Sequence, residues 1–205
     1  PAATLPKPVT VQIPAGRRIV QASFSPDSKS LAIILGADDG LELAVADVAT
    51  GTSRTLTEAK LSGVLSAPCS WSANLALVCL MRTEGKPPQK PVIPNGPAIQ
   101  ETRSGSAPNP TYQDMLQDPG DEALFEHYAT SRPVRITLDG AAVPIGPWSL
   151  YRRVTPSPDG RYVLVQKISR PFSYVVPFNR FPTTTEVWNS DGTLAKRVAE
   201  TPLQD

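Results

Sequence analysis

A short turn sequence recurs along this chain, and a run of apolar residues follows each copy. Ser25-Pro26-Asp27 precedes the apolar residues 31–35, and Ser157-Pro158-Asp159-Gly160 precedes residues 162–165. A weaker copy at residues 71–74 precedes the run 75–80. Proline presets φ at the second turn position, aspartate can hydrogen-bond the backbone ahead of it, and glycine tolerates the exit. The repeat therefore predicts a hairpin turn that leads into a strand in each repeating unit.

The other parts of each unit also recur. Residues 41–47 alternate between apolar and polar side chains and lead through a turn into residues 53–56. Residues 185–188 and 194–198 repeat that arrangement around a second turn. Alternation is typical of half-buried strands, whereas the fully apolar run after each Ser-Pro-Asp turn indicates packing on both faces. Four strands per unit is the pattern of a β-propeller blade.

The spacing of the turns predicts an insertion in the second unit. Ser25 and Ser72 are 47 residues apart, close to the roughly 40–45 of a typical blade repeat. Ser72 and Ser157 are 85 residues apart, so the second unit has an excess of about 40. The stretch 82–110 holds seven prolines, which strand interiors do not accept. We therefore place the insertion at residues 82–132.

Two short helices are expected in the later part of the insertion. Thr111 and Asp114 have the spacing of a capping box, with aspartate in place of glutamate. Asp118 followed by Pro119 puts proline at a first helical position. The second blade is expected to resume at Val134.

The predicted fold class is all-β: a partial β-propeller of about three four-stranded blades with a Pro-rich, partly helical insertion. The 23 prolines and 13 glycines agree with many turns and little long helix. Residues 1–20 are expected to form a lead-in strand and residues 21–205 the partial propeller. Propellers typically close with about four to eight blades, so we expect the chain to be a piece of a longer protein.

Composition excludes several classes of function. Lys and Arg total 20 against 19 Asp and Glu, which gives no electrostatic reason to expect nucleic acid or a membrane surface as a partner. No apolar run approaches the roughly 20 residues of a membrane span, and residues 1–10 lack the pattern of a signal peptide. No metal-ligand cluster or cofactor motif is present, so no cofactor is expected. Cys69 and Cys79 are expected to be buried thiols, with a disulfide as the alternative.

Several segments together resemble one known family, the glutamyl endopeptidases, a branch of the prolyl oligopeptidase family found in bacteria and chloroplasts. These segments are residues 94–101 (PNGPAIQE), 111–116 (TYQDML), 121–128 (DEALFEHY), 156–160 (PSPDG), 171–177 (PFSYVVP), 180–182 (RFP) and 186–188 (EVW). The blade turns are shared by many propellers, whereas the insertion and the stretch 171–182 are more specific. The match covers most of residues 20–205.

The resemblance implies an N-terminal propeller that caps a C-terminal α/β-hydrolase domain carrying a Ser-Asp-His triad. Its nucleophile would lie at an elbow of Gly-x-Ser-x-Gly type, and this chain has no such motif. His127 is the only histidine of the chain. A triad requires a base within reach of a nucleophile, so His127 is expected to be a helix-surface or packing residue. No catalytic residue is therefore assigned to this chain.

One end of the propeller is expected to hold a substrate-binding surface. In a blade, the loop between the second and third strands lies at the same end as the link to the next blade. The insertion, residues 169–184 and residues 146–151 should therefore meet. Guanidinium groups bind carboxylates through paired hydrogen bonds, so one or more arginines there is expected to hold a glutamyl substrate or a peptide terminus. The alternative is that they pair with acidic residues or coat the surface. The candidate residues are Tyr151, Arg152, Arg153, Arg170, Tyr174 and Arg180.

The expected function is therefore that of a propeller segment of a serine endopeptidase that cleaves peptides after Glu. This segment would restrict access to the active site and contribute to substrate recognition. Its expected partners are a C-terminal α/β-hydrolase domain of the same protein and a peptide substrate. The alternative is a stand-alone β-propeller interaction module similar to TolB, without catalysis. Trp71, Trp148 and Trp188 are expected to pack between blades rather than to form a ligand cage. The sequence favours a periplasmic or secreted protein over a cytoplasmic or plastid one.

Overall fold

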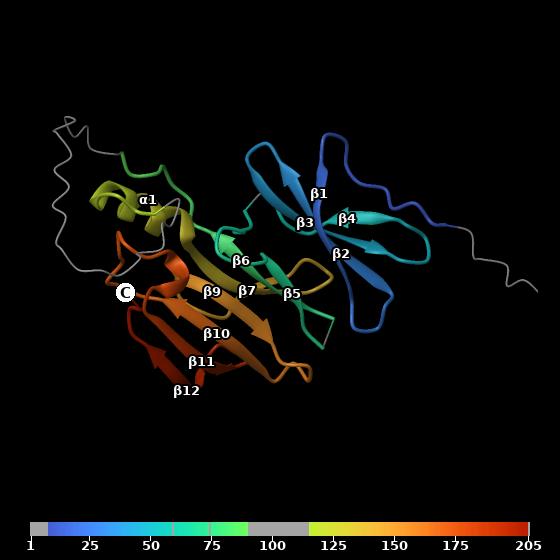
Figure 1. Ribbon diagram of the computed structural model, residues 1–205. Coiled ribbons are helices and arrows are strands. Elements are labelled where there is room, and N and C mark those ends of the chain that lie inside the picture. Colours follow the sequence, from blue (N-terminus) through green and yellow to red (C-terminus); the bar gives the residue numbers. More distant parts are fainter. Residues whose placement is uncertain (1–7, 59, 74, 90–114, 205) are drawn as a thin grey trace, which may run out of the picture.

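The chain forms three successive four-stranded antiparallel units, shown in a computed structural model that describes residues 8–58, 60–73, 75–89 and 115–204 (Figure 1). The first unit consists of β1 (Arg18–Phe24), β2 (Ser30–Ala37), β3 (Gly40–Asp47) and β4 (Ser53–Thr55). The second consists of β5 (Cys69–Trp71), β6 (Leu77–Arg82), β7 (Thr130–Ile136) and β8 (Ala142–Pro144). The third consists of β9 (Ser149–Pro156), β10 (Tyr162–Ile168), β11 (Thr183–Asn189) and β12 (Leu194–Thr201). The predicted partial propeller is thus confirmed.

The recurring turns have the hydrogen bonds that their sequence predicts. The Ser25 hydroxyl donates to the Asp27 carboxylate at 2.7 Å and accepts from the Ser30 backbone N–H at 2.9 Å. In the third blade, Ser157 and Asp159 repeat this pattern at 2.6 Å. Each turn therefore closes on its own side chains and delivers the chain into the next strand.

Blades pack face to face through the strands that follow these turns. The first core cluster joins the first two blades and includes Ile34, Leu43 and Leu77. The second cluster joins the second and third blades and centres on Tyr151 and Trp188, whose rings meet edge to face at 6.1 Å. Trp71 also bridges blades, because its indole N–H donates to the Ser23 carbonyl of β1 at 3.1 Å.

Two sequence expectations about core residues are wrong. Cys69 and Cys79 are joined by a disulfide and are not free thiols, because they face each other across the β5–β6 pair. Trp148 is 48% exposed and lies beside the guanidinium of Arg132, so it does not pack between blades. The expectation of blade packing holds for Trp71 and Trp188, which lie in sheet strands rather than in a link.

Helix α1 (Pro119–Ala129) precedes β7, the third-strand position of the interrupted second blade. It begins as predicted: the Asp118 side chain accepts from the Asp121 N–H, and Pro119 occupies the first turn. β7 starts at Thr130, four residues before the predicted Val134, because the chain turns directly from the helix into the sheet. The helix predicted near Thr111 lies outside the described residues.

Candidate functional site

The strand connections gather at one end of the molecule. The insertion follows β6, the link of residues 169–182 follows β10, and the links of residues 56–68 and 145–148 connect successive blades. All of these segments leave or enter strands at the end opposite the Ser-Pro-Asp turns. Figure 1 shows α1 beside the β10–β11 link at this end. We call it the loop end.

A cluster of phenylalanines fixes α1 at the loop end. The ring of Phe125 meets those of Phe172, Phe178 and Phe181 at centroid distances of 5.2, 6.5 and 5.9 Å. Phe172 and Phe181 stack on each other at 5.3 Å. The 3-10 helix η1 (Phe178–Arg180) lies in the link that supplies these rings. Helix α1 is therefore packed against the third blade, although it belongs to the insertion in the second.

Arg170 forms a second connection between α1 and the β10–β11 link. Its guanidinium pairs with Glu122 and donates to both carboxylate oxygens of Glu126, at 2.9 and 3.1 Å. These pairs raise the pKa of Arg170 above its ordinary value. Hydrogen bonds from Tyr174 and then from Arg170 lower the pKa of Glu122. Arg170 thus follows the alternative considered from the sequence, an ion pair within the protein.

The remaining predicted site residues do not form one cluster. Tyr151 is fully buried, and its hydroxyl donates to the Pro147 carbonyl at 2.8 Å, so it offers no surface to a ligand. Burial raises the pKa of Tyr151. Arg152 donates to the Asn179 carbonyl at 3.1 Å, whereas Arg153 is exposed on β9.

Arg180 and Tyr174 both lie in the β10–β11 link. Arg180 ends η1, and its carbonyl accepts from the Gln204 N–H at 3.1 Å. Tyr174 is 41% exposed, and its hydrogen bond to Glu122 raises its pKa. Of the six predicted residues, the structure therefore brings Arg170 and Tyr174 together around Glu122. It places Tyr151 in the core.

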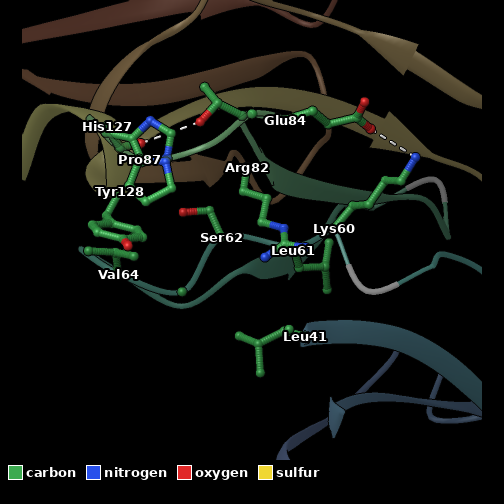
Figure 2. A pocket seen from close by; sticks show the side chains of 14 residues that line it. Leu41, Lys60, Leu61, Ser62, Val64, Arg82, Glu84, Pro87, His127 and Tyr128 are labelled. Carbon is green, nitrogen blue, oxygen red and sulfur yellow. Dashed lines mark hydrogen bonds and ion pairs between the residues drawn. The ribbon is translucent and has the colours of Figure 1, made fainter. Parts of the chain in front are cut away.

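A cleft of about 760 Å³ opens at the loop end between the first two blades and the end of α1. Its floor is the segment 60–64, which hydrogen-bonds β3 on one side and β6 on the other. Figure 2 shows the side chain of Arg82 extending into the middle of the cleft, with Tyr128 and Val64 on one side and Lys60 on the other. The lining residues are Gly40, Leu41, Lys60, Leu61, Ser62, Gly63, Val64, Arg82, Thr83, Glu84, Gly85, Pro87, His127 and Tyr128.

The two cations of the cleft differ in their partners. Lys60 pairs with Glu84 at 2.9 Å and with Glu58 at 3.3 Å, which raises the pKa of Lys60 and lowers that of Glu84. No hydrogen bond or ion pair joins the guanidinium of Arg82 to any other residue that the structure describes. The sequence reasoning missed Arg82. Arg82 ends an apolar strand at the point where the insertion begins. This position in the sequence is the signal that would place it at the loop end.

The described part of the chain contains no group of His, Cys, Asp and Glu side chains that could hold a metal ion. No helix within the same residues is long and apolar enough to cross a membrane. His127 lies on α1, where its ring meets that of Tyr128 at a centroid distance of 5.1 Å, and it is partly exposed in the cleft wall.

Comparison with known sequences connects the chain to one group of peptidases. No family model matches it. A probable chloroplastic glutamyl endopeptidase from Oryza sativa subsp. japonica is 36% identical over 98% of this chain. A second, from Arabidopsis thaliana, is 33% identical over 94% of the chain. The predicted resemblance is therefore confirmed. Both relatives are much longer proteins, and the chain spans 22% and 21% of their lengths.

Solved structures confirm the fold. The β-propeller domain of the Trilobed protease from Pyrococcus furiosus matches 91% of this chain and 43% of its own length, with a TM-score of 0.51 and 10% identity. An acylaminoacyl peptidase in complex with a chloromethyl ketone covers 91% of the chain and 25% of its own length, with a TM-score of 0.53 and 11% identity. A TolB from Agrobacterium tumefaciens covers 91% of the chain and 53% of its own length, with a TM-score of 0.50 and 12% identity.

Proposed function

We propose that this chain, which matches a segment of the glutamyl endopeptidases of the prolyl oligopeptidase family, supplies three propeller blades of a serine endopeptidase. The observation that carries the proposal is the sequence match over nearly the whole chain. Catalysis would belong to an α/β-hydrolase domain elsewhere in the same protein. The loop end described above would restrict access to that domain and take part in recognising the peptide.

The packing of the loop end supports a role in controlling access to the hydrolase domain. A segment that controls entry must keep a defined position, and α1 is fixed by the phenylalanine cluster and by the pairs of Arg170. The adjacent cleft is concave and has apolar walls with a few polar groups, which is the usual character of a binding site. Rigid walls beside such a cleft would admit an extended peptide and exclude a folded protein.

The full-length protein is the material for the test. It should react with a serine-directed fluorophosphonate probe and hydrolyse short peptides after Glu. A Phe125→Ala variant, which loosens α1, should raise the rate on a folded protein substrate relative to the rate on a short peptide. Parallel changes in the two rates would contradict the role in access. Absence of both labelling and hydrolysis would contradict the peptidase assignment.

A propeller that binds partners without catalysis is the second candidate. The likeness to TolB over 91% of the chain favours it at the level of the fold. The fluorophosphonate reaction separates the two candidates, because a binding module would have no activated serine to label.

A further inference from the structure

We propose that the cleft between the first two blades binds a carboxylate of a peptide, with Arg82 as the cation and the Ser62 hydroxyl as a second donor. An apolar side chain next to that carboxylate would pack against Val64 and Tyr128. This inference rests on the proposed function for the choice of a peptide as ligand. It adds the site, the recognised group and the residues that hold it.

Arg82 is placed as a ligand-binding arginine would be: among the described residues no hydrogen bond or ion pair holds its guanidinium, and only the charge of Glu84 acts on it at longer range. Its backbone N–H donates to the Lys60 carbonyl at 2.8 Å, which fixes the start of its side chain beside the cleft floor. The guanidinium lies beside Leu61 in the middle of the cleft (Figure 2). No other residue described in the structure pairs with it. A guanidinium offers two parallel N–H donors that match a carboxylate, so an anionic ligand of that shape is the expected partner.

The other charged groups in the cleft direct a carboxylate to Arg82. Lys60 already has Glu84 and Glu58 as partners, so an incoming carboxylate would have to displace one of them. Arg170, at the other side of α1, is likewise held by two glutamates. A ligand therefore meets less competition at Arg82 than at Lys60 or Arg170.

Ser62 supplies a second polar contact. Ser62 is 5% exposed, and Figure 2 shows its hydroxyl directed toward the side of the cleft where Tyr128 lies. Among the described residues, none hydrogen-bonds this hydroxyl. A serine hydroxyl can donate a hydrogen bond to a carboxylate, so Ser62 can serve as the second donor to a ligand in the cleft.

The apolar walls indicate what stands beside the carboxylate. Val64 is 55% exposed and Tyr128 is 53% exposed, although both are large apolar side chains at the same cleft. Leu41 lies below Leu61 in the view, apart from Val64 and Tyr128 (Figure 2). A free inorganic anion would leave these surfaces uncovered, whereas an aliphatic residue next to an acidic one would cover them. The volume, about 760 Å³, suits a short peptide rather than a single ion.

The carboxylate has two sources in a peptide, an acidic side chain or the C-terminus. Equilibrium binding of fluorescein-labelled Ala-Leu-Glu-Ala to the full-length protein distinguishes them. The peptide is compared with its Gln-containing form, with its C-terminal amide and with the form that carries both changes. The protein is first treated with fluorophosphonate so that the peptide is not consumed. If no serine reacts, the proposed peptidase function fails, but the binding measurement proceeds unchanged.

We expect the protein to bind at least one carboxylate-bearing peptide about 10- to 100-fold more tightly than the form with both changes. Arg82→Gln should remove that difference, Arg82→Lys should retain part of it, and Ser62→Ala should reduce it several-fold. Arg161→Gln is the matched control, because Arg161 is an exposed arginine on the opposite, turn-bearing end. A carboxylate preference that persists in Arg82→Gln would overturn the proposal, as would a wild-type protein without any preference.

Discussion

Helix α1 is held to the third blade by two different interactions, and the structure allows their contributions to be ranked. Phe125 packs against three phenylalanine rings of the β10–β11 link. Arg170 pairs with Glu122 and Glu126, but its side chain is 50% exposed. Phe125→Ala removes the aromatic packing and leaves the ion pairs, whereas Arg170→Met removes the ion pairs together with the contact of the guanidinium with the Phe172 ring at 4.5 Å.

The expected costs differ by a factor of several. Truncating a fully buried phenylalanine costs about 3–5 kcal/mol of stability. Because Phe125 is half-buried, Phe125→Ala should lower the free energy that holds α1 in place by about 2–3 kcal/mol. Ion pairs of half-exposed groups are screened by solvent, so both pairs of Arg170 together should contribute about 0.5–1 kcal/mol. Aromatic packing should therefore dominate, even though the ion pairs are the more conspicuous contacts.

Hydrogen exchange of the α1 amides in the full-length protein measures this difference. Each loss of about 1.4 kcal/mol in the free energy of local opening raises the amide exchange rate tenfold. Phe125→Ala should thus accelerate exchange in α1 about 30- to 150-fold, and Arg170→Met about 2- to 5-fold. Amides of β2, which is in the first blade, should be unaffected in both variants. An acceleration by Arg170→Met that equals or exceeds that of Phe125→Ala would refute the ranking.

Two further predictions concern stability. Burial raises the pKa of Glu186, but the hydrogen bonds from Lys167 and Trp188 and the charges of Lys167 and Arg197 together outweigh burial, so the native pKa is lowered. Its stabilising effect should be complete above the unfolded pKa, about 4.3, and decline as pH falls through the lower native value. Urea denaturation between neutral and acidic pH should show this decline, and the decline should be smaller in Glu186→Gln, because other carboxylates with lowered pKa values remain. Gly192→Ala should cost about 2 kcal/mol or more by the same measurement, because φ is +90° and a Cβ would lie 1.9 Å from the Ile145 carbonyl oxygen. Gly140→Ala, with φ +92° and open space, should show the smaller cost of the backbone conformation alone.

The blades could be predicted from the sequence because their signals are local. The bond between Ser25 and Asp27 spans two residues, so the turn is encoded where it forms. The same holds for the N-cap of α1 at Asp118, whose side chain is bonded three residues ahead. Both features depend on side chains that meet without any help from the rest of the fold.

The arrangement of the site could not be predicted, because it depends on contacts between residues far apart in the sequence that no local pattern specifies. Arg170 and Glu122 are 48 residues apart in sequence, and their pairing follows from the docking of α1 on another blade. Tyr151 was expected at the surface, but it is buried beside Trp188 where the third blade packs on the second. Cys69 and Cys79 are brought together by the register of a strand pair. Arg82 was missed because a single arginine at the end of a strand carries no motif.

The two sides of α1 connect the packing of the third blade to the shape of the cleft. Phe125 and Glu126 face the β10–β11 link, whereas His127 and Tyr128 line the cleft. The Thr83 hydroxyl donates to the His127 carbonyl at 3.3 Å, which also joins the end of the helix to the strand that carries Arg82. The position of the cleft wall therefore depends on contacts made on the opposite side of the same helix. In the proposed site, Arg170 would thus contribute to recognition by positioning a wall, while Arg82 would meet the ligand.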